Sequence, residues 1–203
     1  MSRIAATSLL ALILGVAAAQ EPGDYSTVTG PVDLDRIPPA AESPYLLPWP
    51  AGVDRQCIQG VRGIVSHKGD ESFAWDFAMP VGSAVVAARG GTVTRVVVVH
   101  EGRGTDAPNN RVVVDHGDGT SGCYLHLEKG GSLVAVGDVV RRGQPIARSG
   151  NVGRSLVPHL HFQVVDRSGR TIPVSFADES VRADRGVPRM FRRYRSANAA
   201  DEE

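Results

Sequence analysis

Two histidines, two positions apart, give this chain its strongest chemical signal. His159 and His161 flank Leu160 in the mainly apolar run 157–164. If that run is a β-strand, residues i and i+2 project from the same face, so both imidazoles point to one side. Imidazole is the commonest metal ligand and a common general base, so the pair could supply one of each. The spacing alone fits two surface histidines on a solvated sheet face equally well.

Further residues that could bind a metal are spread along the chain. A catalytic zinc ion usually has three protein ligands and one open position for water. The candidates are His67, Asp70, Glu71, Asp76, His100, His116, His126, His159 and His161. His100 ends a strand-like run without a partner nearby, and His116 opens a Gly-Asp-Gly turn whose backbone its side chain can satisfy. We therefore keep His67, an acid near it, and the histidines at 126, 159 and 161.

The elements that must position these residues are short β runs. Residues 49–177 carry them, separated by turns that contain glycine. The expected strands cover 84–88, 92–100, 111–116 and 122–127, with a strand, turn and strand over 133–147. No stretch keeps a 3.6-residue apolar period long enough for a core helix. The sequence therefore predicts an all-β, mainly antiparallel domain over 49–177.

The N-terminus has the features of a secretory signal peptide. Arg3 precedes the apolar run 4–16, and three alanines at 17–19 supply a small-residue cleavage site. The apolar run is shorter than the roughly 20 residues that a membrane-spanning helix needs. We therefore expect a signal peptide at 1–19, no transmembrane segment, and export to the periplasm or the outside of the cell.

The charge balance excludes one class of partner. The chain has 22 basic and 22 acidic residues, so its formal net charge is zero. A general nucleic-acid binder needs a basic surplus or a basic face. We expect no nucleic-acid partner, and a monomer.

The segments outside the expected domain have little apolar pattern. Residues 20–48 are rich in Pro, Ser, Asp and Glu and indicate an extended linker or pro-segment, which could cover the groove. Residues 178–203 form a polar, arginine-rich tail. We favour a solvated tail over a short docking helix or a basic anchor for an anionic wall polymer. Cys57 and Cys123 could form a disulfide in an oxidising compartment or remain two buried thiols.

Three motifs inside the domain resemble those of the LytM/lysostaphin-type zinc endopeptidases. Ser-His-Lys-Gly at 66–69, followed by Trp-Asp-Phe-Ala-Met-Pro-Val-Gly at 75–82, resembles the first metal motif of that family. Tyr-Leu-His-Leu at 124–127 is similar to its Tyr-x-His-Leu segment. Gly-Asn-Val-Gly at 150–153 and Pro-His-Leu-His-Phe at 158–162 are similar to its closing motif. Each motif alone is weak, but three in order form a specific signal.

The resemblance implies a role for each matching residue. It implies zinc ligands at His67, Asp76 and His161, and unligated catalytic histidines at His126 and His159. It also implies the family's fold, the duplicated hybrid motif, with a lysostaphin-type catalytic groove. The separate resemblance of residues 136–147 to half of a biotinyl/lipoyl hammerhead supports a related β architecture, because no lysine occupies a comparable turn.

The distance between the first histidine and the aspartate departs from the family's more familiar pattern. Eight residues separate His67 from Asp76, whereas Asp70 and Glu71 lie nearer the usual, shorter distance. We prefer Asp76, because the run Phe-Ala-Met-Pro-Val-Gly follows it and not the other two.

The resemblance implies a secreted zinc endopeptidase that hydrolyses peptide bonds in bacterial peptidoglycan. Two alternatives stay open: a catalytically silent, zinc-containing module that binds the wall or regulates an amidase, and an endopeptidase that acts on proteins. We expect loops 101–110 and 150–157 to form groove walls, but residue types do not identify the cross-link that they accept.

Overall fold

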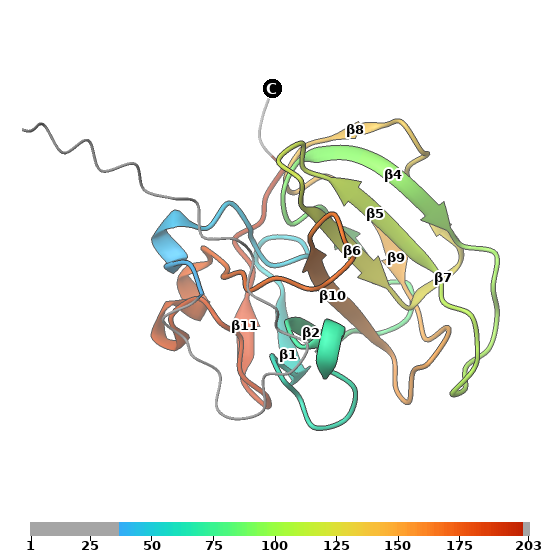
Figure 1. The fold of residues 1–203 in the computed structure, drawn as a ribbon, viewed down its shortest axis with the longest axis horizontal. Coiled ribbons are helices and arrows are strands. Elements are labelled where there is room, and N and C mark those ends of the chain that lie inside the picture. The colour runs from blue at the N-terminus through green and yellow to red at the C-terminus, as the bar shows by residue number, and fades with distance from the viewer. Residues whose placement is uncertain (1–36, 201–203) are drawn as a thin grey trace, which may run out of the picture.

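The chain is built from antiparallel strands in two sheets (Figure 1). The computed structural model describes residues 37–200, so the expected signal peptide and residues 20–36 lie outside the described part. The large sheet has the order β11 (Arg193–Arg195), β1 (Asp54–Gln59), β2 (Ala74–Ala78), β10 (His159–Val165), β6 (Ser121–Leu125), β5 (Arg111–Asp115), β4 (Gly91–Val97) and β8 (Val139–Val140). The small sheet has the order β3 (Ala84–Val86), β9 (Pro145–Ser149) and β7 (Leu127–Ser132).

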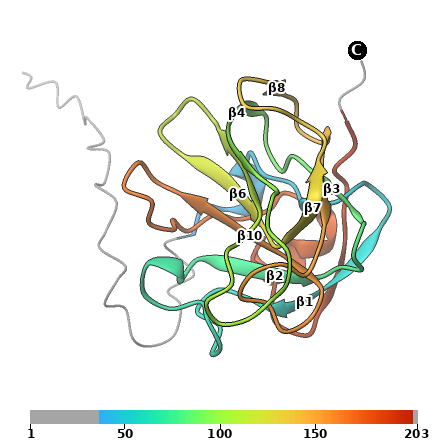
Figure 2. The ribbon, with the colours of Figure 1, turned by 90° about the vertical axis from the view of Figure 1, so that its right-hand side faces the viewer.

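The core lies between the small sheet and one face of the large sheet, which Figure 2 shows beside each other. Side chains alternate along each strand, so every second residue of a strand faces this core. Those that do so and are buried include Trp75, Phe77, Val112, Val114, Tyr124, Leu160, Phe162 and Val164 of the large sheet and Val85, Ile146 and Leu127 of the small one. The sheets are also joined by polar contact, since the backbone N–H of Ala88 donates to the Tyr124 hydroxyl at 2.8 Å.

The fold class predicted from the sequence is confirmed. Every pair of named strands among residues 37–200 is antiparallel. In the described part of the chain, residues 37–200, the helical elements are three short 3-10 turns: η2 (Ala40–Glu42), η3 (Gly69–Glu71) and η4 (Glu179–Asp184). The strand, turn and strand expected over 133–147 are present as β8, a turn at 142–143 and β9, although the segment 133–138 before them is not a strand.

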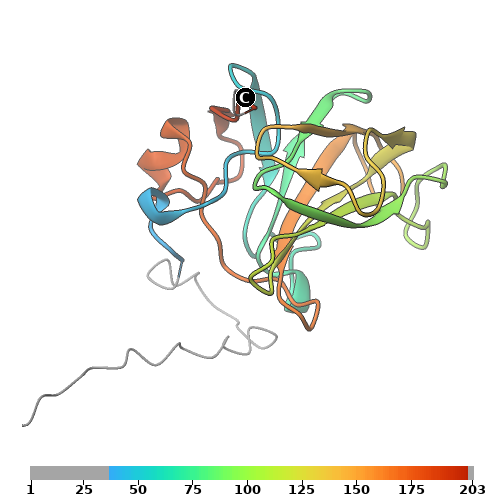
Figure 3. The same ribbon diagram turned by 90° about the horizontal axis from the view of Figure 1, so that it is seen from above.

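The two segments that flank the expected domain pack against it. In residues 37–48, Ile37, Tyr45 and Leu47 are buried, and the N–H of Leu47 donates to the Asp178 carboxylate at 2.8 Å. The 3-10 turns η2 and η4 lie side by side in Figures 1 and 3. The described part of the N-terminal segment is therefore extended but not a free linker.

The interpretation of the arginine-rich C-terminal segment as a solvated tail is wrong for residues 178–200. β11 pairs with β1 and adds an edge strand to the large sheet. Asp184 is buried and accepts hydrogen bonds from the Tyr194 hydroxyl at 2.7 Å and from Arg192. The sequence did not reveal this packing, because Asp184, Arg192 and Tyr194 are all polar and only the folded chain shows that they form hydrogen bonds with one another.

Cys57 and Cys123 are buried free thiols. Burial, together with the nearby Asp76 carboxylate, raises the pKa of the Cys57 thiol to about 12. Burial also raises the pKa of Cys123, to about 11. Both side chains are therefore neutral packing groups in this structure rather than a disulfide. Among residues 37–200, no helix is both long and apolar enough to cross a membrane.

The Asp184 cluster should make a measurable contribution to stability. Asp184→Ala removes the acceptor of the Tyr194 hydroxyl and of two arginines, which should lower the free energy of unfolding by about 2–3 kcal/mol. Urea denaturation measures it. The control is Glu179→Ala, which removes an exposed ion pair with Arg182 and should cost less than about 1 kcal/mol. Equal costs for the two variants would contradict a packed C-terminal segment.

Candidate metal centre

The register between β2 and β10 builds the centre of the site. His161 lies opposite Asp76 in this antiparallel pair, and His159 lies opposite Ala78. His161 Nδ1 is 2.9 Å from Asp76 Oδ1, and His159 Nε2 is 3.5 Å from the same oxygen. Leu160 points to the opposite face and is fully buried in the core. The same-face geometry expected for the two histidines is thus confirmed.

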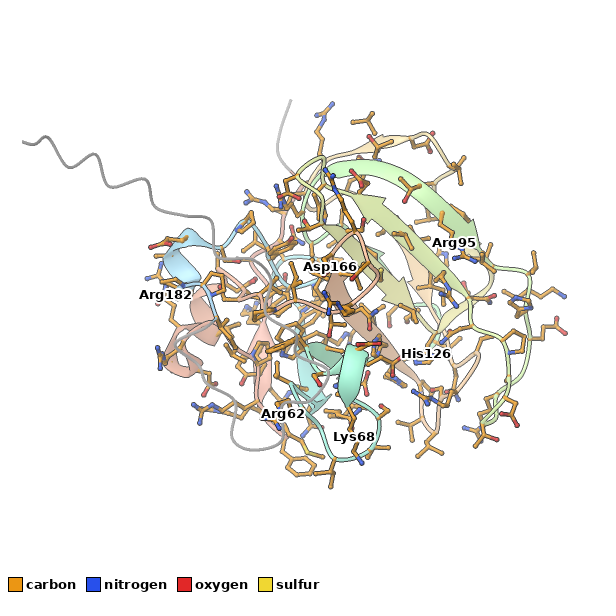
Figure 4. All side chains as sticks on the ribbon, viewed as in Figure 1. Arg62, Lys68, Arg95, His126, Asp166 and Arg182 are labelled. Carbon is orange, nitrogen blue, oxygen red and sulfur yellow. The ribbon has the colours of Figure 1, made fainter. Side chains whose placement is uncertain are left out.

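His67 approaches this pair from the loop between β1 and β2. Its ring is fully buried, whereas its neighbour Lys68 is exposed at the edge of the molecule (Figure 4). His67 Nε2 is 3.2 Å from Asp76 Oδ1 and has no hydrogen-bond partner within residues 37–200. Among the described residues, His67, Asp76 and His161 form a group whose ligand atoms all lie within 4.8 Å of one another.

Outer hydrogen bonds fix which ring nitrogen of each histidine faces the centre. A carbonyl oxygen only accepts, so a ring nitrogen bound to one carries the proton. His67 Nδ1 donates to the Gly60 carbonyl at 2.9 Å, which leaves Nε2 with a lone pair towards Asp76. His161 is held in the opposite sense, because its Nε2 donates to Gln163 Oε1 at 2.8 Å and leaves Nδ1 facing inward.

The two remaining histidines are held in the same way. His126 Nδ1 donates to the Val152 carbonyl at 2.8 Å, and His159 Nδ1 lies 2.7 Å from the Val157 carbonyl and 3.1 Å from the Ser155 hydroxyl. The rings of His126 and His159 lie next to each other, with centroids 4.5 Å apart. Both therefore present Nε2 on the side of the metal ligands.

His126 adopts a backbone conformation that is costly for a residue with a side chain. Its φ is 63°, in the left-handed region, at the point where the chain passes from β6 to β7. Such a conformation costs about 1–3 kcal/mol and persists where surrounding contacts hold it. Asn109 supplies one, since its Oδ1 accepts the backbone N–H of His126 at 3.0 Å. Figure 4 shows His126 among the loops at the end of the sheet.

The buried charges of the site are arranged around Asp76. Burial alone would raise the pKa of Asp76, but contacts with His159, His161 and His67 hold it well below its ordinary value. Burial lowers the pKa of His161, but the Asp76 carboxylate outweighs burial and raises it. Burial, together with the neighbouring histidines, lowers the pKa of His126 to about 3. His126 is thus neutral at pH 7, with an unprotonated Nε2.

These residues fit a zinc ion. Two inward imidazole nitrogens and one carboxylate oxygen are a typical donor set for catalytic zinc, which keeps a fourth position open. The nitrogens of His67 and His161 lie 3.2 Å and 2.9 Å from Asp76 Oδ1. These separations are close to the distance between two ligand atoms around a tetrahedral zinc ion with bonds of about 2.0–2.1 Å. The buried, unpartnered Nε2 of His67 is explained by a cation, because a lone pair aimed at a carboxylate is otherwise unfavourable.

Two loops beside the site are joined to each other. Residues 102–104 and Gly153 form a short parallel bridge through two hydrogen bonds of 3.0 Å, and Arg103 Nη1 donates to the Leu156 carbonyl at 2.7 Å. Gly153 allows this contact, because a Cβ there would lie 2.8 Å from the side chain of Asn109. Loop 150–157 carries the carbonyls that hold His126 and His159, so loop 101–110 supports both histidines through this bridge, in addition to the direct bond from Asn109 to His126.

All five residues expected at the site come together, and the acids nearer His67 do not join them. Glu71 forms an ion pair with Arg154 at 3.0 Å, and Asp70 is exposed. His116 bonds to the Gly90 carbonyl at 2.9 Å, so its side chain satisfies backbone, but not that of its own turn as expected. The sequence reasoning missed the side chains that hold the site: Gln59, Asn109, Ser155 and Gln163. Only Gln163 had a local signal, because it follows His161 by two positions on the same face.

An antiparallel sheet with a buried His-Asp-His cluster and two further inward imidazoles defines the metal centre of a zinc metallopeptidase. The chain belongs to Peptidase family M23, whose sequence profile matches residues 70–173. The match begins just after His67, the histidine that is separated from Asp76 by an unusually long stretch of eight residues. The family membership confirms the resemblance found in the sequence.

Characterised relatives match only part of their own length. The chain is 39% identical over 114 residues to the peptidoglycan DD-endopeptidase ShyA of Vibrio cholerae, which covers 56% of this chain and 24% of ShyA. It is 36% identical over 117 residues to lysostaphin of Staphylococcus simulans, covering 57% of this chain and 20% of lysostaphin. A crystal structure of a zinc-containing peptidase from Vibrio cholerae is 30% identical, with a TM-score of 0.48, and covers 64% of this chain and 39% of that one. The chain thus spans about a quarter or less of these two relatives found by sequence.

Metal retention should separate ligands from neighbours. His161→Ala and Asp76→Asn should lower zinc affinity by more than about 100-fold, because the first removes a ligand atom and the second replaces an anionic oxygen by a neutral amide oxygen. His159→Ala should retain zinc. Competition with a chromophoric chelator measures the affinity. Asp70→Asn and Glu71→Gln are the acid controls and should bind zinc as the unmodified protein does. Zinc loss in His159→Ala with retention in His161→Ala would reverse the assignment.

Proposed function

We propose that this chain is an exported zinc endopeptidase that hydrolyses peptide bonds in bacterial peptidoglycan. The observation that carries the proposal is the full set of five groups: three metal ligands and two unligated histidines with Nε2 directed to the same side. A silent binding module needs no such second pair. The printed activities of the relatives, peptidoglycan DD-endopeptidase and the glycyl-glycine endopeptidase of Staphylococcus capitis, support peptidoglycan as the substrate class.

The roles of the residues follow from their protonation and orientation. A zinc ion held by His67, Asp76 and His161 would lower the pKa of a water molecule and would polarise the scissile carbonyl. His126 is neutral and donates its Nδ1 proton to Val152, so its Nε2 can accept a proton from the attacking water. His159, held through Nδ1, presents Nε2 beside it and is the second group at the reacting atoms; this nitrogen donates to the developing oxyanion once it has itself taken up a proton.

Digestion of peptidoglycan sacculi tests the substrate class. The purified protein should release peptides with new amino groups, and mass spectrometry should identify the cleaved bond. A chelator should abolish the release and zinc should restore it, because the centre needs its metal. Binding to sacculi without chelator-sensitive amine release would favour the silent module. Cleavage of casein without cleavage of sacculi would favour an endopeptidase that acts on proteins.

The unligated histidines should affect turnover and not metal content. His126→Ala and His159→Ala should each reduce the turnover number on sacculi by about 100-fold or more, since each removes a proton-transfer or oxyanion-binding group. Zinc content, measured on the same samples, should stay at that of the unmodified protein. His116→Ala is the control, because His116 follows the end of β5 that pairs with Ser121, at the opposite end of the pair from Leu125 and His126, and bonds to the Gly90 carbonyl. Full turnover in either site variant would remove that residue from the mechanism.

A further inference from the structure

A register shift at the end of β1 aims one polar side chain at the metal centre. Cys57 pairs with Phe77, but Gln59 pairs with Asp76, so β1 advances two residues while β2 advances one. Without that shift, Gln59 would share the core-directed face of Cys57. Bulges of this kind often re-aim a side chain next to a functional site. Here the shift places an amide, buried to 5% exposure, directly against the Asp76 carboxylate.

The Gln59 amide is fully satisfied, and its orientation is fixed. Its Nε2 donates to Asp76 Oδ2 at 2.8 Å and to the Ser66 hydroxyl at 2.9 Å. Its Oε1 accepts the backbone N–H groups of Val65 at 2.9 Å and Ser66 at 3.3 Å. Backbone N–H groups only donate, so the oxygen must face the loop and the NH₂ group must face Asp76.

Through these bonds, one side chain connects two metal ligands. It occupies Oδ2 of Asp76 and leaves Oδ1 for the inward nitrogens of His67 and His161. It also holds Ser66, which directly precedes His67. Gly60, which follows Gln59 in the chain, accepts a hydrogen bond from His67 Nδ1 through its carbonyl. The dipeptide 59–60 therefore fixes the carboxylate and the first imidazole from the same strand end.

The loop between Gln59 and His67 is anchored at its start, where Val61 packs against the core and the Arg62 N–H donates to the Ser72 carbonyl at 2.7 Å. Its later apolar residues do not pack inward, since Ile64 is 79% and Val65 is 65% exposed. A side chain at Gly63 would collide with that of Gln59, so the loop closes over the glutamine itself. This polar anchor accounts for how His67 reaches the site across the unusually long separation from Asp76.

We propose that Gln59 is the positioning residue of the metal centre: it sets the distance between His67 and Asp76 and keeps Asp76 bound to the metal through a single oxygen. Gln59 itself does not touch the metal. The proposal rests on the metal centre and not on the substrate, so it stands apart from the cleavage of peptidoglycan.

Zinc affinity tests the proposal. Gln59→Met preserves length and volume but removes all four hydrogen bonds, and should lower zinc affinity by about 10–100-fold, the usual cost of losing an outer partner of a ligand. Gln56→Met is the matched control, because Gln56 lies on the same strand and bonds to the exposed carbonyl of Phe191. It should bind zinc within about 2-fold of the unmodified protein. Affinity is measured by chelator competition on samples shown to be folded by circular dichroism.

A spectroscopic measurement separates positioning from general destabilisation. The visible absorption of the Co²⁺-substituted protein should change in Gln59→Met, because Asp76 can then rotate and bind through both oxygens, and should not change in Gln56→Met. Gln59→Asn keeps the amide but shortens it by one methylene, and decides the matter if Gln59→Met does not fold; it should lose about 10-fold in affinity. Unchanged affinity and an unchanged spectrum in a folded Gln59 variant would overturn the proposal, as would an equal loss in Gln56→Met. If sacculi are not cleaved but Gln59→Met still loses zinc, only the proposed function fails.

Discussion

The pairing register of β2 with β10 is the constraint on which the site depends. It places Asp76 opposite His161 and turns Phe77 and Leu160 to the core. A slip of one residue would exchange the two faces of the strand, burying the imidazoles among apolar side chains and exposing the leucine. Hydrophobic burial thus specifies the geometry of the metal ligands, although no apolar side chain belongs to the metal group.

Around this register, hydrogen bonds from outside the centre set the chemistry of each ring. A neutral imidazole has one donor and one acceptor nitrogen, and the outer acceptor decides which is which. Carbonyls at Gly60, Val152 and Val157 and the amide of Gln163 perform this task. Four rings are thereby oriented before any metal or substrate arrives, which is the preorganisation that electrostatic catalysis requires.

Much of the fold and the centre could be predicted because the signals are local. Alternation places His159 and His161 on one face, and β-branched runs with glycine turns indicate most of the strands. The supporting residues depend on distant pairings. Gln59 reaches Asp76 only because the pairing register of β1 with β2 shifts between Cys57 and Gln59. The alternation of residues along β1 alone does not indicate that shift. Asp184 and Tyr194 satisfy each other inside a segment whose arginines suggested solvation. Such polar pairs resemble surface residues until the chain is folded.

The bridge between residues 102–104 and Gly153 makes the two loops beside the site one mechanical unit. Loop 150–157 holds His126 and His159, and Arg103 of the other loop donates a hydrogen bond to its Leu156 carbonyl. Variation in one loop must therefore be matched in the other to keep the imidazoles oriented. Loop 101–110 replaced alone would lose its bonds to Gly153 and Leu156, so the two loops would have to be exchanged as a pair to keep both imidazoles held as they are here.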